Sequence, residues 1–262
     1  MRITYIGHAT LLIELADRIF LTDPNFDPKL GGFLPRVSKP GISLARLPRI
    51  DAIFVTHAHA DHLSFKSLDA LASDIPVYAP PAIAKWLKQR GYANVYSIAP
   101  GESVQVGGVE IRAAAATHQG SRYSVDRWRA AANMYLFDTN TVSCFFAGDT
   151  ALTPDSTRLV DHSVTAAGRR LDMALLPIGY APWWKPGFRK GHLTSADALT
   201  LFDQLDARYL IPYHWGTFDH VTSKAHDAIH RLRAQLPAHP RSEMVQILDP
   251  GMSFELPSLL EQ

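Results

Sequence analysis

The chain has 262 residues, of which 47% are hydrophobic and 19% are charged, and its formal net charge is +1 with histidine neutral. This composition is typical of a globular protein, and we predict a single domain over residues 1–262. The balanced charge disfavours a nucleic-acid partner, because binding to a phosphate backbone needs an excess of basic side chains. The one cysteine, Cys144, excludes an intrachain disulfide.

The N-terminal stretch MRITYIGHATLLIEL predicts β-structure rather than a signal peptide, because Glu14 and Asp17 interrupt it early and no small-residue cleavage site follows. No apolar run approaches the roughly 18 residues that a membrane span needs. We therefore expect a cytoplasmic protein and do not favour membrane association.

Apolar runs of strand length recur along the chain, at residues 3–6, 9–15, 18–23, 51–56, 76–80, 109–117, 133–138, 141–148, 172–178 and 208–213. Helical patterns cover residues 64–73, 81–92 and 194–205; Gly91 ends the second, and Thr194 with Asp197 forms a capping pattern in the third. This order predicts an α/β (α+β) fold with two sheets, or one large sheet covered by helices. The Gly/Pro-rich connection 26–49 has a length that is often functional.

The segment HAHADH, residues 57–62, directly follows the predicted strand 51–56. His57 and His59 are two residues apart, which turns their side chains to the same side of an extended chain. Asp61 and His62 follow where the chain must turn before a helix, so the four groups can converge. Neutral imidazoles and a carboxylate are natural ligands for zinc and similar ions. One ion cannot easily take all four, so we expect two adjacent ions.

Three further residues share the position of His57 just beyond an apolar strand. His118 follows the predicted strand 109–117, Asp149 follows 141–148, and His214 follows 208–213. Ligands placed at strand ends are held by a rigid scaffold. We therefore expect these three residues to complete the metal site.

The series THAHADH, His118, AGDT with Asp149, and His214 resembles the ligand series of the metallo-β-lactamase superfamily. The resemblance implies a four-layered αββα sandwich, two mixed β-sheets flanked by helices, with the metals at one edge. It also implies that Asp149 bridges the two ions. The remaining ligands it implies are His57, His59 and His118 for the first ion and Asp61, His62 and His214 for the second.

Further stretches resemble one branch of that superfamily. GHATLLIEL, IFLTDPNF, LPRIDAIFVTHAHADHL and LLPIGYAPWW are similar to the branch containing N-acyl-phosphatidylethanolamine-hydrolysing phospholipase D, with ascorbate-6-phosphate lactonase as a more distant member. The bridging acid implied at Asp149 is typical of phosphodiesterase, lactonase and thioester-hydrolase branches. Penicillin-hydrolysing members lack it, so the resemblance disfavours antibiotic hydrolysis.

We predict a binuclear metal-dependent hydrolase that acts on a phosphodiester or related ester in a small-molecule or lipid-like substrate. Two divalent ions, Zn²⁺ first and Mn²⁺ or Fe²⁺ as alternatives, would lower the pKa of a bridging water toward ~7, and the metal-bridging hydroxide would attack the substrate. Asp61 and Asp149 could also orient that hydroxide. The alternative is a lactonase or other carboxylic-ester hydrolase at the same site; a non-catalytic metal-binding protein is less favoured.

Several residues outside the ligand series have an ordinary interpretation beside a functional one. His192 in KGHLTSAD could hydrogen-bond a phosphate or carboxylate oxygen, as the resemblance suggests, or be an exposed loop histidine. Trp183 and Trp184 could form a wall of the substrate pocket or cap the core. His8 and Asp23 could hold a metal ligand in place or make ordinary structural bonds. Finally, a group of three could contact an anionic substrate or be solvated: Arg122, Tyr123 and Arg127.

Overall fold

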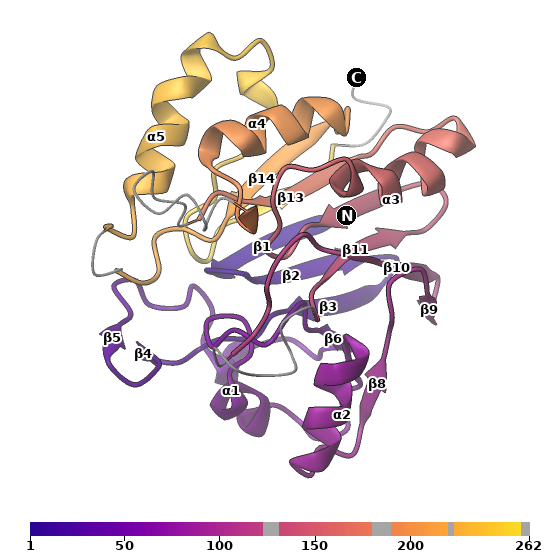
Figure 1. Cartoon of the computed structure of the whole chain (residues 1–262), viewed down its shortest axis with the longest axis vertical. Helices are drawn as coiled ribbons and strands as arrows, with labels where there is room; N and C mark the ends of the chain where they lie inside the picture. The colour runs from indigo at the N-terminus through magenta and orange to yellow at the C-terminus, as the bar shows by residue number, and fades with distance from the viewer. Residues whose placement is uncertain (123–130, 180–189, 220–222, 258–262) are drawn as a thin grey trace.

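The computed structural model describes residues 1–122, 131–179, 190–219 and 223–257. Its strands form two mixed sheets, one of seven and one of six strands, that face one another (Figure 1). Helices cover the outer face of each sheet. The predicted α/β class and the αββα sandwich are therefore confirmed, and of the two arrangements left open the one with two sheets is present.

The first sheet has the strand order β15-β1-β2-β3-β6-β7-β8 and is antiparallel on one side and parallel on the other. Its residues alternate between two cores: Ile3 and Tyr5 of β1 face the second sheet, whereas Ile6 faces the outer helices. The strands are β1 (Arg2–Gly7), β2 (Thr10–Leu15), β3 (Arg18–Thr22), β6 (Ala52–Phe54), β7 (Val77–Ala79), β8 (Val95–Ser97) and β15 (Ser253–Glu255).

The second sheet has the order β14-β13-β12-β11-β10-β9. Every residue of β11, β12 and β13 is buried, because this sheet is covered on both faces, and the sequence accordingly shows continuous apolar runs there. The strands are β9 (Ser103–Val106), β10 (Val109–Ala115), β11 (Asn133–Asp138), β12 (Ser143–Phe146), β13 (Met173–Pro177) and β14 (Tyr209–Tyr213).

The three predicted helices are present as α1 (Phe65–Ala70) and α2 (Pro81–Gln89) beside the first sheet and α4 (Ser195–Gln204) beside the second. The capping box of Thr194 and Asp197 starts α4 as predicted. Two helices were not predicted, α3 (Asp155–Ser163) and α5 (Asp227–Gln235), because most of their residues are polar and show no clear apolar period. Short 3₁₀ turns complete the described elements: Leu44–Arg46, Thr165–Ala167, Leu236–Ala238 and Ser242–Met244.

An aromatic cluster fills the space between the sheets beneath the HAHADH segment. The Phe137 ring lies 5.2 Å from the rings of both Phe20 and Phe54, and Tyr135 lies 5.3 Å from Phe54. All four residues are completely buried. Burying one such ring stabilises the fold by about 1.5–3 kcal/mol. The cluster therefore holds β6, the strand that precedes the HAHADH segment, firmly in the core.

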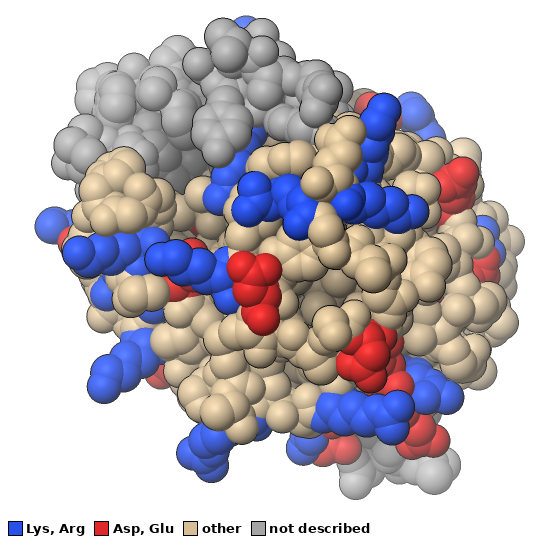
Figure 2. Space-filling model, turned by 90° about the horizontal axis from the view of Figure 1, so that it is seen from below, with Lys and Arg blue, Asp and Glu red and all other residues tan. Residues whose placement is uncertain are grey.

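The connection 26–49 forms a small hairpin, β4 (Lys29–Leu30) and β5 (Leu34–Pro35), before it reaches the first 3₁₀ turn. After the hairpin, Arg36 pairs with Phe218 in an isolated antiparallel bridge, so this connection lies against the segment that follows β14. Figure 2 shows the face at the α1 and α2 end of the molecule, where basic and acidic side chains are both present. Among the described residues, no helix has the length and apolar character needed to cross a lipid bilayer.

Candidate metal centre

The candidate ligands meet because of the strand directions. Strands β10, β12, β13 and β14 all run the same way, so their C-terminal ends share one edge of the second sheet. His118 follows β10, Asp149 follows β12 and His214 follows β14 at that edge. The segment after β6 brings the HAHADH residues to the same place. All seven candidate ligands therefore lie together, which a shared metal site requires.

Two adjacent groups of side chains have donor atoms close enough to hold a metal ion. Within each group, each residue offers one donor atom, and these atoms all lie within 4.8 Å of one another. The carboxylate of Asp149 connects the groups: its Oδ2 lies 3.4 Å from Nε2 of His62 and its Oδ1 lies 3.4 Å from Nε2 of His214. The first group is His57, His59, His118 and Asp149, and the second is His8, Asp61, His62 and His214.

Hydrogen bonds fix the protonation of the first group. Thr56 Oγ1 donates to Asp23 at 2.6 Å, so it must accept from Nδ1 of His57 at 3.0 Å. Likewise, Nδ1 of His118 donates to the Gly191 carbonyl at 2.7 Å. The unprotonated Nε2 atoms of His57 and His118 therefore both face Nδ1 of His59, at 2.9 and 3.1 Å. Nδ1 of His59 cannot donate one proton to both Nε2 atoms. A metal ion between the three nitrogens would accept an electron pair from each of them.

The second group is held in the same way. Nδ1 of His62 donates to Asp23 at 2.8 Å, which turns its Nε2 toward Nε2 of His214 at 3.1 Å. On the other side, Nε2 of His8 lies 2.9 Å from Oδ2 of Asp61. Oδ1 of Asp149 is buried and accepts no hydrogen bond from any described residue. A buried acceptor of this kind is costly unless it has a partner, and a cation between the groups would supply one.

The family model for the beta-lactamase superfamily domain matches residues 18–215, well over half of the chain. The chain belongs to the metallo-β-lactamase superfamily. The matched range contains both groups of candidate ligands except His8, and their His and Asp side chains are able to bind metal ions.

Two relatives show where the chain stands within the superfamily. It is 28% identical to N-acyl-phosphatidylethanolamine-hydrolyzing phospholipase D 1 of Caenorhabditis elegans, over 94% of this chain and 69% of that protein. It is also 28% identical to a UPF0173 metal-dependent hydrolase of Pyrococcus furiosus, over 98% of this chain and 100% of that one. The branch inferred from the sequence is therefore confirmed.

A solved structure shares the fold. Isothiocyanate hydrolase from Delia radicum gut bacteria superposes with a TM-score of 0.78 over 97% of this chain and 99% of that chain. The sequences are 20% identical, so this similarity concerns the fold alone.

Burial and charge set the protonation that metal binding by this superfamily member needs. Burial lowers the pKa of His57 well below its ordinary value and lowers that of His118 to about 3, so both imidazoles are neutral at pH 7. Burial also lowers the pKa of His62, but the carboxylates of Asp149, Asp61 and Asp23 outweigh it and raise that pKa well above its ordinary value. A divalent ion can replace the proton that these carboxylates attract.

The two carboxylates of the centre are ionised. Burial raises the pKa of both, but the surrounding histidines outweigh it and hold both values well below the ordinary range. For Asp61 the histidines are His62, His214 and His8. Anionic oxygens beside neutral imidazoles are the donor set that zinc, manganese and iron all accept.

Asp23 and His8 each contact a candidate ligand, His62 and Asp61 respectively, as the functional interpretation of both residues requires. Asp23 is fully buried and accepts hydrogen bonds from Thr56 and His62. Gly179 has a role that no sequence pattern indicated: a Cβ on this residue would lie 2.0 Å from Nδ1 of His214, so only glycine lets that ring take its place.

His192 lies beside the centre and is partly exposed to solvent. Its Nε2 is 3.5 Å from Oδ2 of Asp149, its ring packs edge-on against His118 at 4.8 Å, and its side chain is 16% exposed. Arg122, expected at a substrate or in solvent, instead donates to the carbonyls of Ala58 and Leu63 and braces the HAHADH loop. Four residues with expected contacts lie outside the described part of the chain: Tyr123, Arg127, Trp183 and Trp184.

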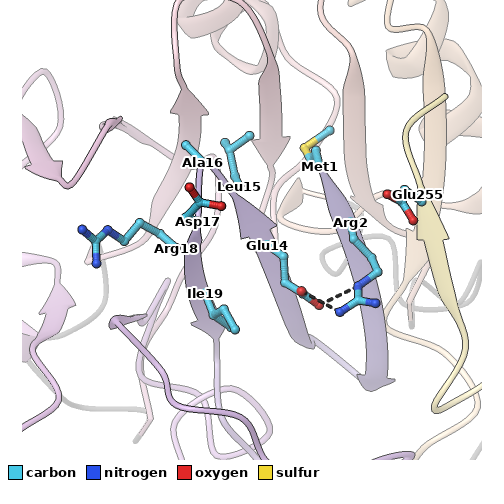
Figure 3. A pocket seen from close by; sticks show the side chains of 9 residues that line it. All are labelled: Met1, Arg2, Glu14, Leu15, Ala16, Asp17, Arg18, Ile19 and Glu255. Atoms are coloured by element: carbon cyan, nitrogen blue, oxygen red, sulfur yellow. Dashed lines mark hydrogen bonds and ion pairs between the residues drawn. The ribbon is translucent and has the colours of Figure 1, made fainter. Parts of the chain in front are cut away.

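A separate hollow of about 490 Å³ lies where β1, β2 and β15 run side by side (Figure 3). Arg2 and Glu14 join across it by a two-point ion pair, with distances of 2.8 and 2.7 Å. Its lining contains no histidine, so it lacks the imidazole donors of the candidate metal centre. The lining residues are Met1, Arg2, Glu14, Leu15, Ala16, Asp17, Arg18, Ile19 and Glu255.

Proposed function

We propose that the protein is a hydrolase that uses two divalent metal ions, with zinc as the first choice, on a phosphodiester or related ester. The observation that carries this proposal is the pair of adjacent His/Asp groups with the carboxylate of Asp149 between them. Seven ligands are too many for one four- or five-coordinate ion. The similarity to a phospholipase D and to a metal-dependent hydrolase supports hydrolysis as the reaction.

We assign a metal-binding, water-orienting or substrate-binding role to each residue of the centre. His57, His59 and His118 would hold one ion, Asp61, His62 and His214 the other, and Asp149 both. Bound there, the ions supply Lewis acidity and lower the pKa of a water molecule. Asp61, with its side chain 20% exposed, can orient that water by a hydrogen bond. His192, partly exposed beside Asp149, can hydrogen-bond an oxygen of the substrate.

The same centre would also serve a lactone or another carboxylic ester, because phosphoryl and acyl groups both need a positioned nucleophile and stabilised negative charge. Substrate class is therefore the point to test. Metal-free protein is loaded with Zn²⁺, Mn²⁺ or Fe²⁺ and assayed with bis(p-nitrophenyl) phosphate, a panel of lactones and a thioester. We expect about two metal equivalents per chain and highest turnover of the phosphodiester. Full activity with a firm plateau at one equivalent would refute the binuclear proposal.

A further inference from the structure

Arg36 stands where the connection 26–49 returns to the metal centre. Its Nη2 donates to the backbone oxygen of Asn25 at 2.6 Å and to Oδ1 of Asn25 at 3.1 Å, while its Nε donates to the carbonyl of Asp27 at 2.8 Å. Burial lowers the pKa of Arg36 to about 10, so the guanidinium remains charged at neutral pH. A half-buried cation whose N–H groups bond to neutral oxygens loses hydration without gaining an ion pair, and this costs stability. Such an arrangement suggests that the geometry of Arg36 has a function.

One route from Arg36 to the metal centre passes through Asn25. This residue is 1% exposed, and its Nδ2 donates to the carbonyl of Ala60 at 2.9 Å. Ala60 lies between His59 of the first group and Asp61 of the second. By holding both oxygens of Asn25, Arg36 fixes the amide that holds this peptide.

A second route passes through Phe218. The Arg36 guanidinium lies 4.8 Å from the centre of the Phe218 ring, and the two residues form a β-bridge. The Phe218 ring packs edge-on against His8 at 5.4 Å. His8 in turn lies 2.9 Å from the carboxylate of Asp61. The backbone route ends at the peptide that precedes Asp61, and this side-chain route ends at the Asp61 carboxylate.

We infer that Arg36 is a positioning residue that fixes Asp61 from two sides and so sets the affinity of the second group for its ion. The inference rests on the proposed function, since it assumes that Asp61 is a metal ligand. Arg36 acts through Asn25 and Phe218 and contacts neither ion. Nothing in the sequence other than the length of the connection indicated such a role.

Hydrogen exchange of the metal-free protein tests the positioning without any metal. We expect Arg36→Met to speed exchange of the amides of His62 and Leu63, which both bond to the carbonyl of His59, by about tenfold. Asn25→Ala, which keeps the guanidinium, should do the same if Arg36→Met fails to fold. Arg169→Met is the matched control, because it removes a guanidinium that pairs with Asp138 at the other end of the second sheet. Equal exchange in wild type and both test variants would overturn the inference.

Metal titration then separates the two groups. In a His118→Ala background, which leaves the second group intact, Arg36→Met should weaken Zn²⁺ binding about tenfold. In a His214→Ala background, which leaves the first group, it should change binding less than about twofold. Equal weakening in both backgrounds would mean a general loss of structure and would overturn the inference. If wild type binds one ion but exchange is faster in Arg36→Met, the positioning stands and the binuclear function fails.

Discussion

Replacing Asp149 by asparagine removes one negative charge from the centre and keeps the shape of the side chain. The carboxylate is 2% exposed, and its two oxygens lie 3.4–4.0 Å from the nearest nitrogens of His57, His62 and His214. An amide in the same place offers one neutral oxygen. Its NH₂ group would face the side on which the second oxygen now stands, and there it would repel a cation.

The expected size of the effect follows from Coulomb's law. Two unit charges about 4 Å apart attract by about 4 kcal/mol at an effective dielectric constant of about 20, so a carboxylate and a divalent ion attract by about 8 kcal/mol. If water and the amide oxygen recover about half of this, about 4 kcal/mol is lost, which corresponds to roughly thousandfold weaker binding. Asp149→Ala should bind metal at least as weakly and should lose most hydrolysis.

Calorimetric titration of metal-free protein with Zn²⁺ at pH 7 measures this effect directly. The matched control is Asp172→Asn, which removes a buried carboxylate that accepts from Ser143 at the opposite end of the second sheet. We expect the control to lose stability but to bind both ions as wild type does. Two equivalents of wild-type affinity in Asp149→Asn would refute the assignment of Asp149 as a shared ligand.

Three further predictions concern the surroundings of the ions. Asp23→Asn should weaken metal binding by about 10–100-fold, because an amide has one acceptor oxygen for the three donors of Thr56 and His62 that the carboxylate now satisfies, and a titration with wild-type constants would contradict this. His192→Asn should keep its metal content by elemental analysis but lower kcat by about a hundredfold, and unchanged turnover of every substrate would show that His192 is an ordinary loop residue. Burial lowers the pKa of His118 and of His8 to about 3, from an ordinary 6.5, so both stay neutral in the folded protein. Their contribution to stability is present above pH 6.5 and is lost as pH falls toward 3, at up to about 1.4 kcal/mol per pH unit each. The free energy of unfolding of the metal-free protein, measured with urea, should therefore fall from pH 6.5 to 5. A flat profile would contradict this.

The positions of the candidate ligands could be predicted from the sequence because each depends on local features. His118, Asp149 and His214 each follow an apolar strand, and a residue just beyond a strand end needs no knowledge of the remainder of the fold to be placed at a sheet edge. The membership of His8 in the second group could not be read in this way. It reaches Asp61, 53 residues along the chain, only because the β1–β2 turn places it at φ +57°.

The helices show the same difference between local and distant causes. The capping box of α4 is visible in four consecutive residues, and this helix was predicted. Helix α3 buries only Ser156 and Val160, so its sequence has too few apolar positions to show a helical period. Its stability comes from packing against the second sheet and not from its own pattern.

The two halves of the centre share one support, the carboxylate of Asp23. It accepts directly from His62 in the second group and, through the hydroxyl of Thr56, it fixes the tautomer of His57 in the first. The backbone of Asp23 is at φ +36°, and His214 also has positive φ, conformations that cost about 1–3 kcal/mol each in residues other than glycine. Such strain persists only where the surrounding contacts determine it. Burial raises the pKa of Asp23, so its negative charge destabilises the folded chain. The function of this buried charge is to orient residues of both groups of candidate ligands.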